Sequence, residues 1–290
     1  LNFAPEQKGR YVLYWMQASQ RARHNLALEY AIRRANALAL PLVVYFGLTE
    51  RYPGANARHY AFMLEGLQET RQALAERGIA LLVQRASPPL GAIELGRQAA
   101  CMVVDRGYLR VQREWYRQVA AQVPCALIQV EDNVLVPVEA ASHQEEYAAR
   151  TLRPKIERQR LEYLGVVEAA EPRLSSLGID VESLDVSDPA EVLQQLDVDR
   201  SVSPAPLLRG GERQAERLLH EFVAHKLERY AEERNDPARD ATSHLSPYLH
   251  FGQISPVWVA LQALRAGGAG AGDFLEELIV RRELDINYVF

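Results

Sequence analysis

Short apolar runs alternate with longer amphipathic stretches through the first half of the chain. The runs have the length of buried strands: Tyr11–Met16, Leu42–Phe46, Leu81–Gln84, Met102–Asp105 and Ala126–Val130. The intervening stretches carry apolar residues at helical spacing: Asn25–Leu38, Ala57–Arg77, Leu90–Ala100 and Leu109–Gln122. Strands that alternate with helices predict a parallel sheet covered on both faces. We therefore expect a Rossmann-like α/β domain with a five-stranded parallel sheet over residues 1–132.

The pattern changes twice further along the chain. Over residues 133–200 prolines and glycines interrupt short segments, which predicts a partly helical connector between domains. From residue 201 to 290 the apolar spacing is helical, and Ser255-Pro256 is typical of a helix start. We expect an all-helical second domain over residues 201–290.

Composition and charge narrow the class of protein. With 48% hydrophobic and 24% charged residues, the chain is typical of globular proteins, and no apolar run reaches the roughly 20 residues of a membrane span. Cys101 and Cys125 lack metal-ligand spacing, so we expect buried thiols in a reducing, cytoplasmic compartment. The net charge of −5 argues against non-specific coating of DNA, although a local positive surface would suffice for a specific DNA enzyme.

One turn combines several groups that suit a phosphate. Thr242, Ser243 and Ser246 place hydroxyls close together, and Pro247 follows. Ser246 as an N-cap with Pro247 at the first helical position would begin a helix and offer free N–H groups. Helix capping alone is the commoner role of such hydroxyls, so the turn by itself leaves both interpretations open. No Gly-x-Gly-x-x-Gly follows the first strand, and a dinucleotide site of that kind is not expected.

The order of motifs resembles the photolyase/cryptochrome family, and more narrowly the class II cyclobutane pyrimidine dimer photolyases. The segments that carry the resemblance are Tyr14–Gln17, Arg21–Asn25, Arg58–Leu67, Tyr230, Arg234–Pro237, Thr242–Gly252 and Glu277–Leu284. The resemblance covers most of the chain and thins between about Leu164 and Leu208. It implies FAD as cofactor, UV-damaged DNA as partner, and light-dependent repair by electron transfer to a flipped-out dimer.

The resemblance also implies roles for single residues. The flavin would be held by Tyr230, Thr242, Ser243, His244, Leu245, Ser246 and Arg281. DNA would be contacted by Arg234, Glu277 and Arg282, and Glu277 would also be the catalytic residue that hydrogen-bonds the dimer. Val280 stands where other classes carry Trp, so the pattern leaves open which of the two arginines serves the flavin. Without the resemblance, Glu277 would simply pair with Arg281 at i,i+4.

An antenna chromophore is a further implication of the resemblance. A deazaflavin or folate would lie at the end of the first strand, near Trp15, Met16 and Gln17. The alternative is that Trp15 is a buried packing aromatic. No metal site is expected.

Family members continue past the Glu277 motif, so we expect this chain to be truncated. We also expect the complete protein to be a monomer. Two other functions remain open at this stage: a cryptochrome-like flavin photoreceptor without repair, and a nucleotide-binding or interaction domain remnant without activity. Bound flavin would separate the first of these from the second.

Overall fold

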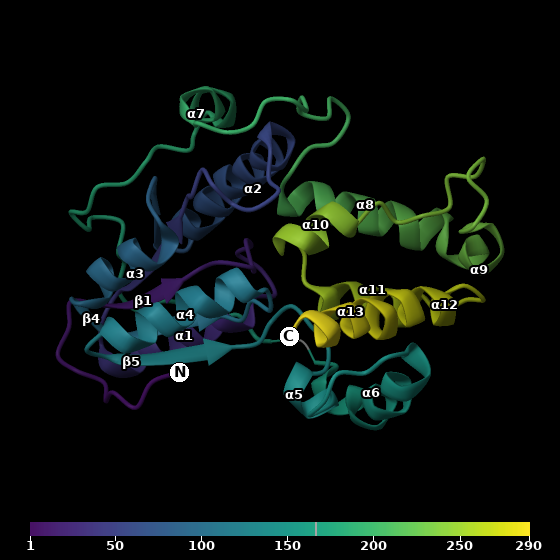
Figure 1. The fold of residues 1–290 in the computed structure, drawn as a ribbon, viewed down its shortest axis with the longest axis horizontal. Coiled ribbons are helices and arrows are strands. Elements are labelled where there is room, and N and C mark those ends of the chain that lie inside the picture. The colour runs from purple at the N-terminus through teal and green to yellow at the C-terminus, as the bar shows by residue number, and fades with distance from the viewer. Residues whose placement is uncertain (166) are drawn as a thin grey trace.

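The first half of the chain folds around a parallel sheet. The computed structural model describes residues 1–165 and 167–290. It contains a five-stranded sheet in the order β3-β2-β1-β4-β5, in which all neighbouring strands are parallel (Figure 1). The strands are β1 (Tyr11–Trp15), β2 (Leu42–Gly47), β3 (Ala80–Gln84), β4 (Ala99–Asp105) and β5 (Ala126–Val130). The predicted fold class is confirmed.

Helices cover both faces of this sheet. They are α1 (Leu26–Leu38), α2 (Ala57–Glu76), α3 (Pro88–Gly96) and α4 (Arg110–Gln122). Because successive strand residues point to opposite faces, Val12 and Tyr14 pack against α1 and α2, whereas Leu13 and Trp15 pack on the face that carries α3 and α4. The helix predicted to reach Ala100 ends earlier, because β4 takes up Ala99 and Ala100.

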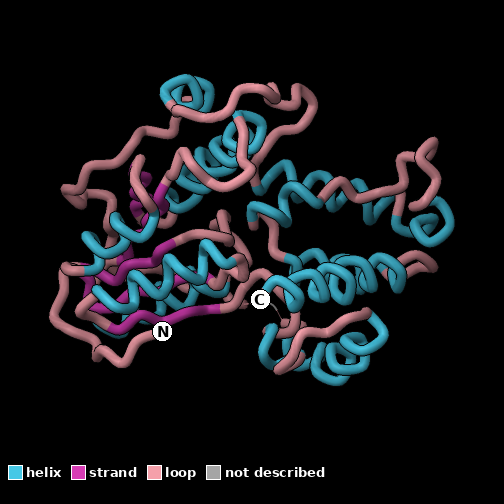
Figure 2. Tube along the Cα trace, in the orientation of Figure 1, coloured by secondary structure: helices cyan, strands magenta, loops and turns pink. Residues whose placement is uncertain are grey.

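The segment after the sheet is partly helical. It contains α5 (Val138–Ala141), α6 (Ala149–Tyr163) and α7 (Pro189–Gln195). The chain between α6 and α7 then runs back along the first half, in the long loops of Figure 2. Leu184 N–H donates to Val83 O at 2.7 Å, and Val186 joins the core under α1 and α2. This segment therefore covers the edge strand β3, which would otherwise expose unpaired backbone groups.

The second half consists of helices around their own apolar core. They are α8 (Glu212–His225), η1 (Leu227–Arg229), α9 (Tyr230–Glu233), α10 (Ser246–Phe251), α11 (Pro256–Ala266), α12 (Ala271–Leu275), the π-helical η2 (Glu276–Arg281) and α13 (Arg282–Val289). Leu152 and Ile156 of α6 belong to the same core as Leu219 and Phe222 of α8. In the described residues no helix combines the length and apolar character needed to cross a membrane.

Candidate functional site

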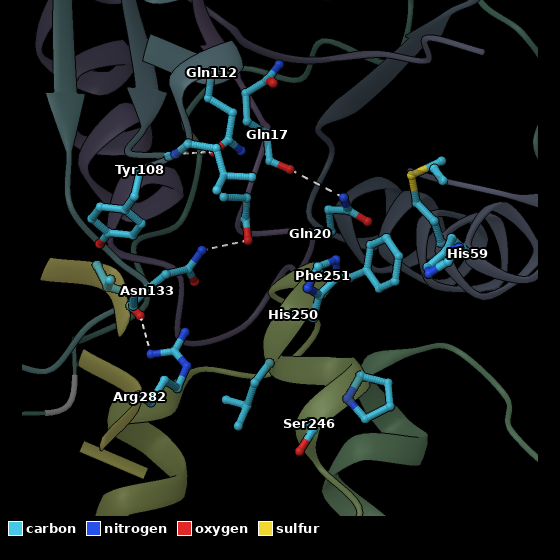
Figure 3. Close-up of a pocket in the computed structure, with 18 of the residues that line it drawn as sticks. Gln17, Gln20, His59, Tyr108, Gln112, Asn133, Ser246, His250, Phe251 and Arg282 are labelled. Carbon is cyan, nitrogen blue, oxygen red and sulfur yellow. Dashed lines mark hydrogen bonds between the residues drawn. The ribbon is translucent and has the colours of Figure 1, made fainter. Parts of the chain in front are cut away.

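A large cavity lies between the two halves. Its volume is about 1320 Å³. One wall follows the carboxyl ends of β1, β2 and β4, where ligands of open α/β sheets usually bind. The opposite wall comes from the helical half, and Figure 3 shows side chains of both walls facing one another. The lining includes Gln17, Gln20, Leu48, Tyr108, Asn133, Tyr230, Thr242, Ser243, His244, Ser246, Glu277, Arg281 and Arg282.

The Thr242–Ser246 turn forms part of the helical wall. Thr242 and Ser246 are exposed to the cavity, and their hydroxyls bond to no other described residue of the protein. Leu245 is the exception within the turn, since it is buried in the helical core. The prediction of Ser246 as the N-cap is wrong by one position, because α10 begins at Ser246 and Leu245 occupies the cap. The hydroxyls are therefore available to a ligand.

Backbone strain marks the centre of the same turn. His244 has φ of +56°, in the left-handed region that non-glycine residues seldom adopt. Its Nε2 lies 2.6 Å from Asp240 Oδ1, and Lys226 Nζ lies 2.8 Å from Asp240 Oδ2. Side-chain hydrogen bonds from Lys226 and His244 lower the pKa of Asp240. The contacts of Asp240 with Lys226 and His244 hold the turn in this conformation.

Glu277 and Arg234, two residues expected to act on DNA, contact each other. Arg234 Nη1 donates to Glu277 Oε1 at 2.5 Å, and the Arg234 guanidinium lies 5.7 Å from the ring centroid of Tyr230. Glu277 does not pair with Arg281, as the simple helical spacing would suggest. The π-helical turn instead brings Arg281 to Glu276, five positions away, at 3.2 Å.

Arg281 and Arg282 both line the cavity but differ in their surroundings. The Arg281 side chain is 55% exposed, whereas Arg282 is more enclosed and donates from Nη1 to Asn133 O at 2.6 Å. Desolvation lowers the pKa of Arg282. The next residue, Glu283, accepts hydrogen bonds from the backbone N–H groups of Leu135 and Val136, and burial raises its pKa to about 8.

The three residues expected near an antenna lie in different places. Trp15 and Met16 are fully buried on opposite faces of the sheet, and Trp15 packs edge-on against Tyr116 at 5.7 Å. Only Gln17 lines the cavity. Next to it, Gln20 donates from Nε2 to Gln17 O at 3.3 Å, while its buried Oε1 has no partner among the described residues. The cavity wall here is therefore polar, and one of its buried hydrogen-bond acceptors has no partner among the described residues.

Sequence reasoning missed the residue that shapes this wall. Asp105, at the end of β4, accepts hydrogen bonds from the successive N–H groups of Gln17, Ala18 and Ser19 and from the Tyr14 hydroxyl. Burial raises the pKa of Asp105 to about 6. The sequence did contain a signal for this role, because Asp105 is an acidic residue at the end of an otherwise apolar strand. Among the described residues no group of His, Cys, Asp and Glu forms a metal site.

Comparisons with known proteins agree with this architecture. The family model described as DNA photolyase matches residues 12–174. The deoxyribodipyrimidine photo-lyase of Methanothermobacter thermautotrophicus is 46% identical over 288 residues, which are 98% of this chain and 62% of that protein. Its counterpart from Potorous tridactylus is 33% identical over 285 residues, 96% of this chain and 53% of that protein. The chain thus spans only part of the length of these relatives.

Solved structures show the same fold at low sequence identity. The cryptochrome of Synechocystis sp. PCC6803 superposes with a TM-score of 0.80 at 19% identity, over 96% of this chain and 60% of that one. A class III photolyase from Agrobacterium tumefaciens gives 0.73 at 20% identity, over 100% of this chain and 61% of that one.

Proposed function

The chain belongs to the DNA photolyase family, and on that premise we propose that it serves light-dependent repair of cyclobutane pyrimidine dimers in UV-damaged DNA. The observation that carries the proposal is the cavity of about 1320 Å³, whose helical wall has the free hydroxyls of Thr242 and Ser246 and is also lined by the carboxylate of Glu277. A dimer flipped out of the duplex needs such a pocket, because its reacting bonds are inaccessible inside the stack.

We propose FAD as the cofactor, held by Tyr230 and by the Thr242–Ser246 turn. The free hydroxyls of Thr242 and Ser246 and the cavity-facing His244 fit a diphosphate and a polyhydroxyl chain. Reduced flavin, when bound, supplies the electron for dimer splitting. The protein supplies binding and electrostatics. Tyr230 is only 8% exposed and its ring meets Phe222 and Phe274 edge-on, so it presents a fixed edge to the cavity.

Glu277 is the residue we propose to contact the dimer. Its carboxylate oxygens accept hydrogen bonds, so it would receive one from a base edge of the lesion. Arg234 holds Glu277 on the opposite side, which limits the rotamers that the carboxylate can adopt. We therefore propose that Arg234 acts together with Glu277, and that it reaches DNA phosphate only if this pair opens.

The motif leaves the assignment of the two arginines open, and we propose that Arg281 contacts DNA and that Arg282 serves the flavin. Arg281 is half-exposed at the cavity wall and suits a DNA phosphate. Arg282 is more enclosed and suits a negative charge inside the cavity, such as a flavin phosphate. The class II assignment is also a proposal, and it rests on the Tyr14–Gln17, Arg21–Asn25 and Arg58–Leu67 segments, with which Val280 is compatible. A deazaflavin or folate antenna would meet Gln17.

The test is repair of a thymine-dimer oligonucleotide under blue light, with bound flavin quantified in the same sample. Glu277→Gln is expected to keep flavin and to repair about 10- to 100-fold more slowly, the equivalent of one hydrogen bond to a charged group. Glu276→Gln is the matched control, since Glu276 pairs with Arg153 and Arg281 and does not line the cavity. Equal effects of both variants would contradict the role of Glu277. Bound flavin without any repair would favour a photoreceptor.

A further inference from the structure

One loop of the first half contacts three helices of the second. This loop, residues 17–25, follows β1 and precedes α1, and we call it the docking loop. Its contacts are Ala22 N to Glu212 Oε2 of α8 at 3.2 Å, Gln20 N to Phe251 O of α10 at 3.4 Å, and the ring of His24 stacked on Trp258 of α11 with centroids 4.1 Å apart. The position of the helical wall therefore depends on this loop.

Arg21 is the centre of the docking loop, and it is completely buried. All five N–H donors of its guanidinium have partners. Nε donates to His24 O at 3.2 Å, and Nη2 donates to Asp132 O at 3.2 Å and to Asp132 Oδ2 at 2.5 Å. Nη1 donates to Asn133 Oδ1 at 3.2 Å and to Gly252 O at 3.0 Å. A single side chain thus joins the segment after β5 to the end of α10.

The contact at Gly252 is close because this position is a glycine. Gly252 ends α10 in the left-handed conformation, with φ of +66°. A Cβ on it would lie 1.8 Å from Ala18 O, so only glycine allows α10 to approach the docking loop this closely. The guanidinium of Arg21 also stands at the carboxyl end of the helix, where a positive charge is favourable.

The docking loop is in turn fixed to the sheet. The N–H groups of Gln17, Ala18 and Ser19 donate to the Asp105 carboxylate at 2.8 to 3.1 Å. From Asp105 a continuous set of contacts leads through the loop and Arg21 to Gly252. At the other end of the six-residue α10 is Ser246, which faces the cavity. Because α10 has only six residues, a shift or loosening at Gly252 also reaches Ser246.

We propose that Arg21 is a positioning residue for the cavity: by clamping the carboxyl end of α10 it sets the place of the Thr242–Ser246 turn. Arg21 itself does not line the cavity and is not expected to touch the ligand. The proposal rests on the proposed function only where flavin affinity is the readout. The clamp on α10 is measured without any ligand.

Two variants weaken this clamp in different ways. Arg21→Lys keeps a positive charge beside Asp132, but its single ammonium group cannot also reach Gly252 O in the geometry of the guanidinium fork. Gly252→Ala leaves the Arg21–Asp132 pair intact and pushes α10 away from Ala18 O. The control is Arg34→Lys, because Arg34 pairs with Glu6 and contacts neither the docking loop nor α10.

The first measurement is hydrogen exchange of the backbone amides that close α10, those of Leu249, Gly252 and Gln253. Arg21→Lys and Gly252→Ala are expected to speed their exchange about tenfold relative to wild type, the equivalent of one buried hydrogen bond, with sheet amides unchanged. The FAD dissociation constant of both variants is expected to rise about tenfold. Arg34→Lys is expected to change neither quantity.

Two results would overturn the proposal: exchange in α10 that stays at the wild-type rate in Arg21→Lys, or faster exchange with unaltered FAD affinity. If the wild-type protein binds no FAD, the proposed function fails, while hydrogen exchange still decides whether Arg21 clamps α10.

Discussion

Glu283 is a carboxyl group that folding removes almost completely from water. It is 4% exposed, and burial raises its pKa to about 8, against an ordinary value of 4.5. The backbone N–H groups of Leu135 and Val136 oppose this shift but do not cancel it. Between the two pKa values the folded protein therefore binds a proton that the unfolded chain has released. The free energy of unfolding should fall as pH rises through this range, by about 1.4 kcal/mol per pH unit at most.

The expected fall of the free energy of unfolding with rising pH gives a prediction for Glu283→Gln. The neutral amide cannot ionise, so the variant should lose the part of the pH dependence that wild type shows up to about pH 8. Urea unfolding at intervals between pH 5 and pH 9 measures it. Glu212→Gln is the comparison, because burial raises the pKa of Glu212 only to about 7, and its effect should end one pH unit earlier. Parallel pH curves for Glu283→Gln and wild type would contradict the prediction.

The neighbouring arginines should differ in what they contribute to stability. Arg281→Gln removes a half-exposed pair with Glu276 and should change the free energy of unfolding by no more than about 0.5 kcal/mol. Arg282→Gln removes an enclosed donor to Asn133 O and should cost about 1 to 3 kcal/mol. Chemical denaturation of both variants measures the difference. Equal costs would show that the enclosure of Arg282 has no energetic consequence.

At the residue scale, the resemblance named residues whose positions the structure shows, but the sequence spacing did not give their partners. Tyr230, the Thr242–Ser246 turn and Glu277 do share one cavity. The spacing rule for α-helices paired Glu277 with Arg281, and the structure pairs it with Arg234, which lies 43 positions away. Spacing arguments assume a regular helix, and the extra residue of the π-turn changes which side chains lie above one another.

Among the elements, α1 begins with a cap that has a second role. Asn25 accepts a hydrogen bond from Leu28 N at 2.8 Å, and its Nδ2 donates to the carbonyl groups of Ser19 and Arg21 in the docking loop. Asn25→Ala should therefore cost about 2 kcal/mol or more, since buried carbonyl groups lose a donor in addition to the cap. Asp188→Ala removes the exposed cap of α7 and should cost about 1 kcal/mol or less. Thermal unfolding of the two variants compares them, and an equal loss would exclude the second role of Asn25.

The sequence pattern predicted which strands and helices exist in the first half, but it did not predict where a helix becomes irregular. Every strand and helix expected in the first half is present, with ends shifted by a few residues. In the second half, helical apolar spacing continues from Glu212 to Tyr230, but α8 ends at His225 and the chain continues as the η1 turn before α9. The apolar residues keep helical spacing across this break, because both pieces face the same core. Periodicity therefore detects the buried face but not a local change in backbone geometry.

At the scale of the whole molecule, the sequence pattern could not predict the order of the strands in the sheet. Alternation of strands and helices predicts a parallel sheet, but β1 could have paired with several strands, and its actual neighbours are β2 and β4. The cavity depends on contacts between distant segments, such as Arg21 with Gly252, 231 positions apart. No periodicity reports such a contact. The resemblance to a family placed the flavin residues in the second half and an antenna in the first, and the structure is what brings Gln17 into the same cavity as Tyr230 and Glu277.

Under the proposed function, the net charge of this chain predicts how it should bind DNA. With a net charge of −5, the protein lacks the excess of positive charge that coats undamaged duplex, so affinity should come from the flipped lesion and a few phosphate contacts. We expect dimer-containing duplex to bind about 10³-fold more tightly than undamaged duplex at physiological salt. The logarithm of the affinity should fall with the logarithm of salt concentration with a slope of about −3 or shallower.

Arg281 provides the test of this view, since it is the half-exposed arginine of the cavity wall. Arg281→Gln should make the salt slope shallower by about 1 and leave the preference for damaged duplex unchanged, because a phosphate contact carries no information about the lesion. Arg229→Gln is the matched control: that side chain is similarly exposed and pairs with Glu233, but it does not line the cavity. Fluorescence anisotropy over a series of salt concentrations measures both quantities. A steep slope shared by damaged and undamaged duplex, unaffected by Arg281→Gln, would mean that DNA binds elsewhere on the surface and that the cavity does not receive the lesion.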